Sequence, residues 1–243
     1  MVKFDKDSLS AMLQKDLPPR LVEDSIFSVF PTNEHGNEYD GQFGFFYDLI
    51  ACNPIYNRLI WGYSIHVFRN MAKEALNSSC DGCVLDLASG SLAFTAKAYA
   101  QYIDRPVILM DQSLKMLKMA KARLIKEKGR VPENIIFLHS DALHLPFKKN
   151  TFNTVISENL LHCLQDTAPL LNQLQNVLTQ NGTAYFSTLV KRHRWADKYL
   201  QGLADSGKIV SRTVNDHRKK FDQLDFATTY ETLCNLLLIQ CKK

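Results

Sequence analysis

The sequence predicts an α/β protein with a doubly wound, mostly parallel seven-stranded sheet, a C-terminal antiparallel strand and an N-terminal helical extension. From residue 83 onward, short continuous apolar runs alternate with helix-compatible stretches. This pattern is typical of strands that are buried on both faces of a parallel sheet and connected by helices. The chain ends differently, in two strand-like runs around Cys234 and Asn235. These runs predict a hairpin and therefore an antiparallel strand.

The individual elements follow from local signals. Ser113 can cap a helix whose apolar positions recur through residue 126, and Gly129 can end it. The other helices rest on the same 3.6-residue spacing, and the strands on apolar runs of three to seven residues. We expect helices at 64–77, 95–103, 113–126 and 168–178. We expect strands at 83–87, 106–110, 135–138, 154–156, 183–189, 229–233 and 236–241.

Residues 1–78 lack this alternation, and we predict that they form a helical extension attached to a core at 79–243. An aromatic-rich stretch from Phe43 to Trp61 includes Tyr47 and Tyr56. Large rings either fill a core or cover a ligand, and the pattern leaves both interpretations open. In the second case the extension is a lid over a binding cleft.

Composition and charge exclude several classes. Of the 243 residues, 46% are hydrophobic and 22% are charged, which excludes disordered and collagen-like chains. No apolar run reaches the roughly 18 residues of a membrane span, and the charged first residues do not resemble a signal peptide. We therefore expect a cytoplasmic protein with no transmembrane segment. Its oligomeric state cannot be predicted from these features.

The net charge of +4 is unevenly distributed. Residues 1–60 carry 5 basic and 9 acidic side chains, a net −4, whereas residues 191–243 carry 11 and 6, a net +5. A basic segment of this strength is typical of a solvated face, and we expect no nucleic-acid partner. A basic C-terminal surface that docks RNA is the alternative.

Cysteine spacing gives one candidate metal motif. Cys80 and Cys83 have the C-x-x-C spacing of zinc sites, but no second pair follows at ligand spacing. Cys83 also begins an apolar run, as a buried core cysteine does. We expect no metal site.

Acidic and small residues follow three successive strands. Ligands of open parallel sheets bind outside the carboxyl ends of the strands, where the topology changes direction. Asp86 precedes a turn of small residues that includes Gly90, and Asp111 follows the second strand. A carboxylate at 111 can accept hydrogen bonds from a ribose diol, and Asp141 with the Ala142 N–H can read an adenine edge. The sequence therefore predicts a nucleoside site.

A dinucleotide-binding dehydrogenase is the first alternative. Its G-x-G-x-x-G fingerprint would fall on Ala88, Gly90 and Ala93, so a single glycine remains. No tyrosine is followed four residues later by a lysine, which removes the catalytic pair of short-chain reductases. The dehydrogenase interpretation is therefore disfavoured.

The segments 84–90, 110–113, 141–147 and 152–157 resemble the class I S-adenosylmethionine-dependent methyltransferases, which have a Rossmann-like fold. The resemblance is closest to the small-molecule branch that includes ubiquinone/menaquinone-type enzymes, and it covers about residues 43–190. It implies S-adenosylmethionine as cofactor, S-adenosylhomocysteine as product and a small-molecule methyl acceptor. It also implies that residues 88–90 line the methionine portion, that Asp111 holds the ribose and that tyrosines of the extension close over the cofactor. The implied cofactor-binding residues are Asp86, Ala88, Ser89, Gly90, Asp111, Gln112, Asp141, Ala142, Ser157, Tyr47 and Tyr56.

Two features bear on catalysis. His162, with Glu158 near it, follows the fourth strand where an acceptor would approach, and either can serve as a general base; a packing histidine is the alternative for His162. Leu92 stands where the family has a glycine, so a positive φ there would cost roughly 1–2 kcal/mol, and its side chain would intrude on the cofactor. We expect methyl transfer to a small, largely apolar acceptor through an oxygen, nitrogen or activated carbon. The alternative is a non-catalytic domain that binds the cofactor or a partner.

Overall fold

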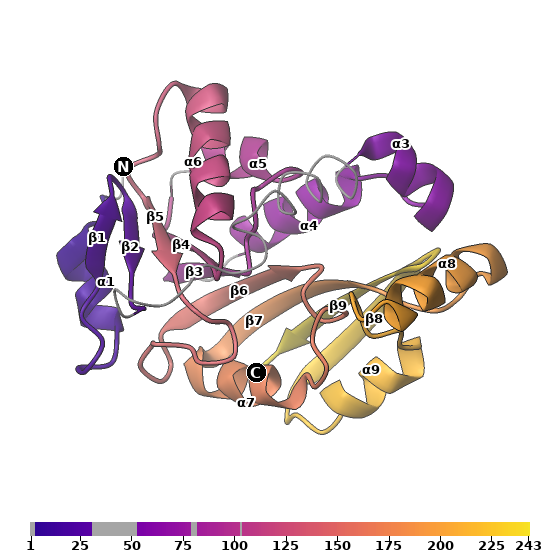
Figure 1. Cartoon of the computed structure of the whole chain (residues 1–243). Helices are drawn as coiled ribbons and strands as arrows, with labels where there is room; N and C mark the ends of the chain where they lie inside the picture. Colours follow the sequence, from indigo (N-terminus) through magenta and orange to yellow (C-terminus); the bar gives the residue numbers. More distant parts are fainter. Residues whose placement is uncertain (1–2, 31–52, 79–81, 103) are drawn as a thin grey trace.

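The computed structural model describes residues 3–30, 53–78, 82–102 and 104–243. Within them a nine-stranded sheet runs in the order β1-β2-β5-β4-β3-β6-β7-β9-β8, with helices on both faces (Figure 1). The first half of the chain contains α1 (Lys6–Met12), β1 (Arg20–Glu23), β2 (Ile26–Ser28), α3 (Pro54–Tyr56), the π-helix η2 (Asn57–Trp61), α4 (His66–Leu76), β3 (Cys83–Leu87), α5 (Ala96–Gln101), β4 (Val107–Asp111) and α6 (Leu114–Lys128). The second half contains β5 (Ile135–His139), β6 (Phe152–Glu158), α7 (Ala168–Val177), β7 (Leu178–Leu189), α8 (Arg194–Asp205), α9 (Val214–Phe221), β8 (Ala227–Leu233) and β9 (Leu236–Lys242).

The central strands are parallel, and the chain changes direction at β3. After β3 the chain adds β4 and β5 on one side, and it then returns to place β6 and β7 on the other side. The carboxyl ends of β3 and β6 therefore lie next to each other at the point where the topology switches. In open α/β sheets this is the place where ligands bind.

Alternation of side chains along each strand separates two apolar layers. Val84 and Val107 pack with residues of α4, α5 and α6, whereas Leu85 and Ile108 pack with residues of α7 on the opposite face. Figure 1 shows α4, α5 and α6 on one side of the sheet and α7 and α9 on the other. Both faces of the central strands are covered, which explains their continuous apolar sequences.

The predicted α/β fold is confirmed, including the terminal hairpin. Ser113 caps α6 by accepting a hydrogen bond from the Met116 N–H, and Gly129 ends it at a φ of 79°. Strand β9 is antiparallel to β7, and the turn to β9 places Cys234 at a φ of 53°. The seven predicted strands correspond to β3–β9.

Residues 20–28 add two strands to the extension that the sequence predicts to be helical and that also contains α1, α3 and α4. They form β1 and β2, and β2 adds to the sheet in parallel with β5. Strand β2 has only three residues, so no periodicity marks it. Its pairing with β5 and the burial of Ile26 determine its conformation. The aromatic stretch before residue 53, including Tyr47, lies outside the described residues, as does Cys80.

The described ranges contain neither a membrane-spanning helix nor a metal-binding cluster. None of their helices is long and apolar enough to cross a bilayer. Within those ranges no three His, Cys, Asp or Glu side chains are grouped so that they could hold a metal ion. Cys83 is buried, and burial raises the pKa of its thiol to about 12.

Candidate functional site

The loop after β3 has an unusual backbone. Ala88, Gly90 and Leu92 all have positive φ, between 56° and 58°. The space where a Gly90 side chain would lie is open, with no atom within 4 Å of an added Cβ. A ligand can therefore approach the backbone at Gly90. The positive φ at Ala88 and Leu92 costs roughly 1–2 kcal/mol each, because an L side chain is strained there.

Leu92 has the expected positive φ, but its side chain does not lie in the open part of the loop. It is 2% exposed and packs in the apolar layer under α4, α5 and α6. Burial of a leucine contributes about 1.5–3 kcal/mol, which offsets the backbone strain. The expected intrusion of this side chain on a ligand is therefore not supported.

Asp111, at the end of β4, connects two neighbouring turns. Its Oδ2 accepts a hydrogen bond of 2.8 Å from the Gly90 N–H, and its Oδ1 accepts one of 2.8 Å from the Ser113 N–H. The Ser89 N–H also donates to the Met110 carbonyl at 2.9 Å. These bonds fix the Asp111 carboxylate beside the open side of Gly90. Each carboxylate oxygen has a second lone pair, so the group can still accept from hydroxyls.

Asp86 is the buried acid of the site. It is 3% exposed, and the Tyr99 hydroxyl donates a hydrogen bond of 2.6 Å to its Oδ2. Burial raises the pKa of Asp86 to about 7, the Tyr99 hydrogen bond opposes this rise, and the nearby Asp111 charge adds to it. Asp86 forms no ion pair with a described residue.

Glu158, at the end of β6, has a similar environment. Burial and the charge of Asp86 raise the pKa of its carboxyl well above the usual range. No described cation is paired with it. The two acids therefore form a region of the site that lacks a positive counter-charge.

Several polar atoms at the β3 and β6 ends lack partners. They are buried, and none has a hydrogen-bond partner among the described residues: Ser89 Oγ, Ser157 Oγ, Glu158 Oε1 and Asn159 Oδ1. An unsatisfied buried polar atom costs about 1–3 kcal/mol, and a polar ligand removes this cost. A ligand with hydroxyl groups and a positively charged end fits these atoms and the two acids.

Asn159 was not predicted as a site residue. It has a φ of 59°, and its N–H donates to the Ser187 carbonyl at 2.9 Å. Asn159 lies one residue past the end of β6, next to Ser157 and Glu158, which the sequence predicts as site residues. This position is the signal in the sequence that could have identified it.

Asp141 lies beyond β5 and forms a local turn. Its Oδ1 accepts from the Leu143 N–H at 2.8 Å, and its Oδ2 lies 2.6 Å from His144 Nδ1. The Ser140 N–H donates to the Asp111 carbonyl, so this turn and Ala142 after it lie at the same sheet edge as β4. The backbone carbonyl oxygen of Gln112, another predicted site residue, lies 3.1 Å from His139 Nε2.

Tyr56 belongs to a cluster of rings at the extension. Its hydroxyl donates to the Tyr199 hydroxyl at 2.9 Å, and its ring meets Trp61 edge to face at 6.5 Å. Trp61 is buried with Leu189, the last residue of β7. The rings therefore lie near the carboxyl end of the sheet.

His162 does not have the environment of a general base. It is 3% exposed, and its Nδ1 accepts a hydrogen bond from the Leu189 N–H at 3.2 Å. Burial lowers the pKa of its imidazole to about 3, with further lowering by His217 and Arg212. The structure therefore favours the packing interpretation over the predicted catalytic one, because burial decides the basicity of this ring.

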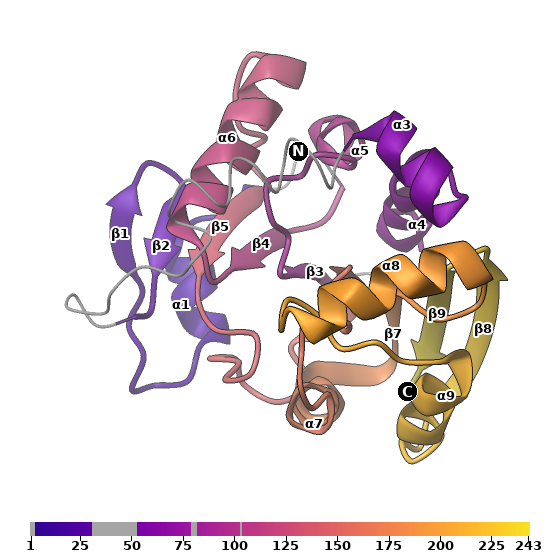
Figure 2. The ribbon, with the colours of Figure 1, turned by 45° about the vertical axis from the view of Figure 1, so that its right-hand side comes forward.

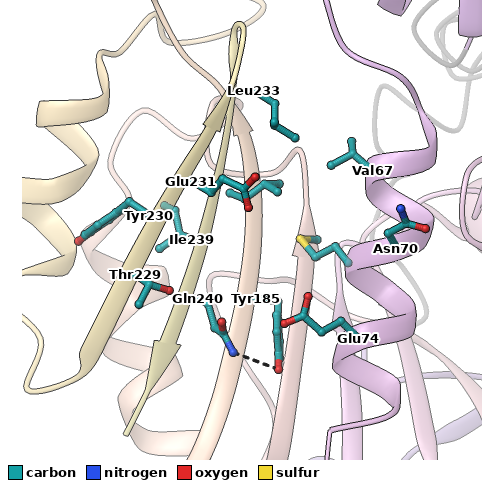
Figure 3. A pocket seen from close by; sticks show the side chains of 12 residues that line it. Val67, Asn70, Glu74, Tyr185, Thr229, Tyr230, Glu231, Leu233, Ile239 and Gln240 are labelled. Atoms are coloured by element: carbon teal, nitrogen blue, oxygen red, sulfur yellow. Dashed lines mark hydrogen bonds between the residues drawn. The ribbon is translucent and has the colours of Figure 1, made fainter.

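A separate groove of about 520 Å³ lies on the sheet face beside α4 (Figure 3). Helix α4 lines one side with Asn70 and Glu74, and β8 and β9 line the other with Glu231 and Gln240. The groove reaches Tyr185 in the middle of β7, not the strand ends. It is therefore distinct from the site at the β3 and β6 ends.

Known methyltransferases are similar to this chain in sequence and in fold. Residues 85–186 match the family model described as a methyltransferase domain. The chain is 32% identical over 137 residues to the demethylmenaquinone methyltransferase of Lactiplantibacillus plantarum, covering 54% of this chain and 56% of that protein. It is 29% identical over 126 residues to the ubiquinone/menaquinone biosynthesis C-methyltransferase UbiE of Wigglesworthia glossinidia brevipalpis, covering 51% and 49%. These matches span about half the length of the two relatives.

A solved structure shows the same fold. The geranyl diphosphate C-methyltransferase of Streptomyces coelicolor, in complex with Mg²⁺, geranyl diphosphate and S-adenosyl-L-homocysteine, superposes with a TM-score of 0.59 at 11% identity, covering 73% of this chain and 77% of that one. Over the matched residues this chain is similar to the class I S-adenosylmethionine-dependent methyltransferases, a family that uses S-adenosylmethionine as cofactor and releases S-adenosylhomocysteine.

Proposed function

We propose that this chain transfers the methyl group of S-adenosylmethionine to a small, largely apolar acceptor. The observation that carries the proposal is the site at the topological switch, where acids without a counter-charge and unpartnered polar atoms surround the open backbone of Gly90. The relatives named for ubiquinone/menaquinone biosynthesis and for demethylmenaquinone support an apolar acceptor methylated at carbon.

In this proposal each strand end holds a different part of the cofactor. Asp111 accepts from the ribose hydroxyls, and the Asp141 turn with Ala142 contacts the adenine. Asp86 provides negative charge for the positively charged amino acid end, and the Gly90 loop allows close approach of the backbone. Residues 79–243 thus form the cofactor-binding core, and part of residues 1–78, including Tyr56 and Trp61, forms the acceptor side.

The cofactor supplies an electrophilic methyl group on a sulfonium. The protein's contribution is to align the acceptor with that methyl and to exclude water from it. The ring cluster of Tyr56, Trp61 and Tyr199 provides an apolar wall near the sheet edge for this purpose.

Glu158 is the proton acceptor that we retain in the proposal. Its Oε1 has no partner among the described residues, and burial raises its pKa, which makes its carboxylate a stronger base than an exposed one. His162 has no such capacity, because burial lowers its pKa to about 3.

We expect His162→Gln to retain methyl transfer within about threefold of the wild type, because the glutamine carbonyl can replace Nδ1 as acceptor of the Leu189 N–H. Loss of a general base typically costs about 10²–10⁴-fold, which we expect instead for Glu158→Gln. The measurement is the single-turnover rate of methyl transfer. A hundredfold loss in His162→Gln with unchanged folding would restore His162 as the base.

The function itself is tested in two steps. Calorimetry with S-adenosylhomocysteine is expected to show binding by the wild-type chain, and no binding at millimolar ligand would refute the cofactor site. Incubation with radiolabelled S-adenosylmethionine and a panel of quinol, phenol, carboxylate and amine acceptors is expected to label the quinol. Binding without transfer to any acceptor would instead indicate the non-catalytic alternative.

A further inference from the structure

Large apolar side chains are exposed at one end of the molecule. Ile55, Leu59, Trp195 and Tyr199 have 69%, 77%, 87% and 41% of their surfaces exposed. They come from α3, η2 and α8, which lie at the same end of the molecule in Figures 1 and 2. We refer to these four residues as the apolar ridge. Only Leu21 and Ile125 are comparably exposed elsewhere among the described residues.

The apolar ridge is anchored to buried side chains of the core. The Tyr56 hydroxyl donates to Tyr199 at 2.9 Å, and the rings of Trp61 and Tyr199 lie 5.5 Å apart. Beneath them, Trp61 and Leu200 belong to one buried cluster with Leu189 at the end of β7. The exposed side chains are therefore presented by helices that are fixed to the core.

Basic side chains flank the ridge. Arg58 and Lys198 are exposed, and neither forms an ion pair with a described residue. Lys198 Nζ lies 5.8 Å from the centre of the Trp195 ring. The acid of the first turn of α8, Asp197, accepts hydrogen bonds from the backbone of Arg192 and from Asn235, and it forms no ion pair with Arg58 or Lys198.

We propose that the apolar ridge docks on a membrane surface that contains anionic lipids. Helices with exposed aromatic and aliphatic side chains beside lysine and arginine bind at the boundary between headgroups and acyl chains. Tryptophan and tyrosine rings favour this region, and each basic residue near an anionic surface contributes about 1 kcal/mol. Charge complementarity selects lipid over a second copy of the chain, since the basic residues of two copies would repel.

Docking would bring the sheet edge to the bilayer. The ridge adjoins Leu189 through Trp61, and Leu189 ends β7 at the same edge as the cofactor site. An apolar acceptor dissolved in the membrane would then reach the site without crossing water. This consequence rests on the proposed function, whereas the docking itself does not.

Co-sedimentation with phosphatidylcholine vesicles, with and without phosphatidylglycerol, tests the docking. We expect the wild type to bind the anionic vesicles more tightly and to lose affinity as salt increases. The triple variant Ile55→Ser, Leu59→Ser, Trp195→Ser should bind at least about tenfold more weakly, because apolar burial is lost. Arg58→Glu and Lys198→Glu should each weaken binding to anionic vesicles at least about fivefold.

The matched control is Leu21→Ser with Lys126→Glu, which removes an exposed leucine and reverses an exposed lysine away from the ridge. It should bind vesicles as the wild type does. Equal binding by the triple variant and this control would overturn the proposal, as would no binding by the wild type. Ridge-dependent dimerisation in light scattering, or ridge-dependent binding of an RNA oligonucleotide without vesicle binding, would assign the surface to another partner and also overturn it. Affinity for S-adenosylhomocysteine, measured on the same variants, separates failure of docking from failure of the cofactor site.

Discussion

Replacing Asp111 by alanine is expected to weaken S-adenosylhomocysteine binding about 100-fold or more. Two hydrogen bonds from a ribose to a carboxylate contribute about 1.5–3 kcal/mol each, and both are lost. The substitution also removes the acceptor of the Gly90 and Ser113 N–H groups, so the loop that shapes the site loses its anchor. Calorimetry measures the change in affinity.

Asp111→Asn and Asp16→Ala are the controls for this variant. The asparagine retains one acceptor and the shape of the side chain, so we expect an intermediate loss. Asp16 is exposed and distant in sequence from the strand ends, so its removal should leave affinity unchanged. Urea denaturation checks that each variant is folded. Wild-type affinity in a folded Asp111→Ala protein would contradict the ribose assignment.

Replacing Asp86 by asparagine is expected to stabilise the fold at alkaline pH and to weaken cofactor binding. The pKa of Asp86 is raised from 3.8 to about 7, mainly by burial. The folded state therefore holds a proton that the unfolded state releases, and the free energy of unfolding falls as pH rises from about 4 to about 7. The full difference amounts to about 4 kcal/mol, which Asp86→Asn avoids because its amide does not ionise.

The stability gain should therefore grow between about pH 4 and about pH 7 in urea denaturation. Asparagine can still accept the Tyr99 hydrogen bond through its carbonyl oxygen, so packing is kept. Affinity for S-adenosylhomocysteine, measured above about pH 7 where Asp86 is ionised, should fall about tenfold or more, since the negative charge opposite the amino group is lost. Tyr99→Phe is the matched control, because it removes the hydrogen bond and keeps the Asp86 carboxyl. It should lower the free energy of unfolding at both ends of this pH range. A pH-independent effect of Asp86→Asn would contradict the raised pKa.

Local sequence patterns predicted most of the sheet. Strands β3 to β9 are recognisable because each buries both faces or ends at a hairpin, and helix α6 because Ser113 and Gly129 mark its limits. Strands β1 and β2 carry no such pattern. Strand β1 pairs only with β2, and β2 pairs with β5, a neighbour more than 100 residues away in sequence; no local signal reports this second pairing.

The same division holds for the site. Asp86, Asp111 and Asp141 lie at or near the carboxyl ends of three strands. This placement predicted a nucleoside site, because parallel strands bring their carboxyl ends to one edge. The roles of Leu92 and His162 were not predictable in this way. Both depend on which layer surrounds the side chain, and this arises from packing between distant segments.

The sequence alone determined the α/β class, the order of the central strands along the chain, the resemblance to methyltransferases and the acids of the site. The tertiary structure decided the edge pairing of β2, the burial that lowers the pKa of His162 and raises that of Asp86, and the exposure of the apolar ridge. The physical reason is that hydrophobic periodicity is a local property of the chain. Desolvation is not local, because it depends on everything that packs around a side chain, and it sets both the pKa of a buried group and the availability of a surface.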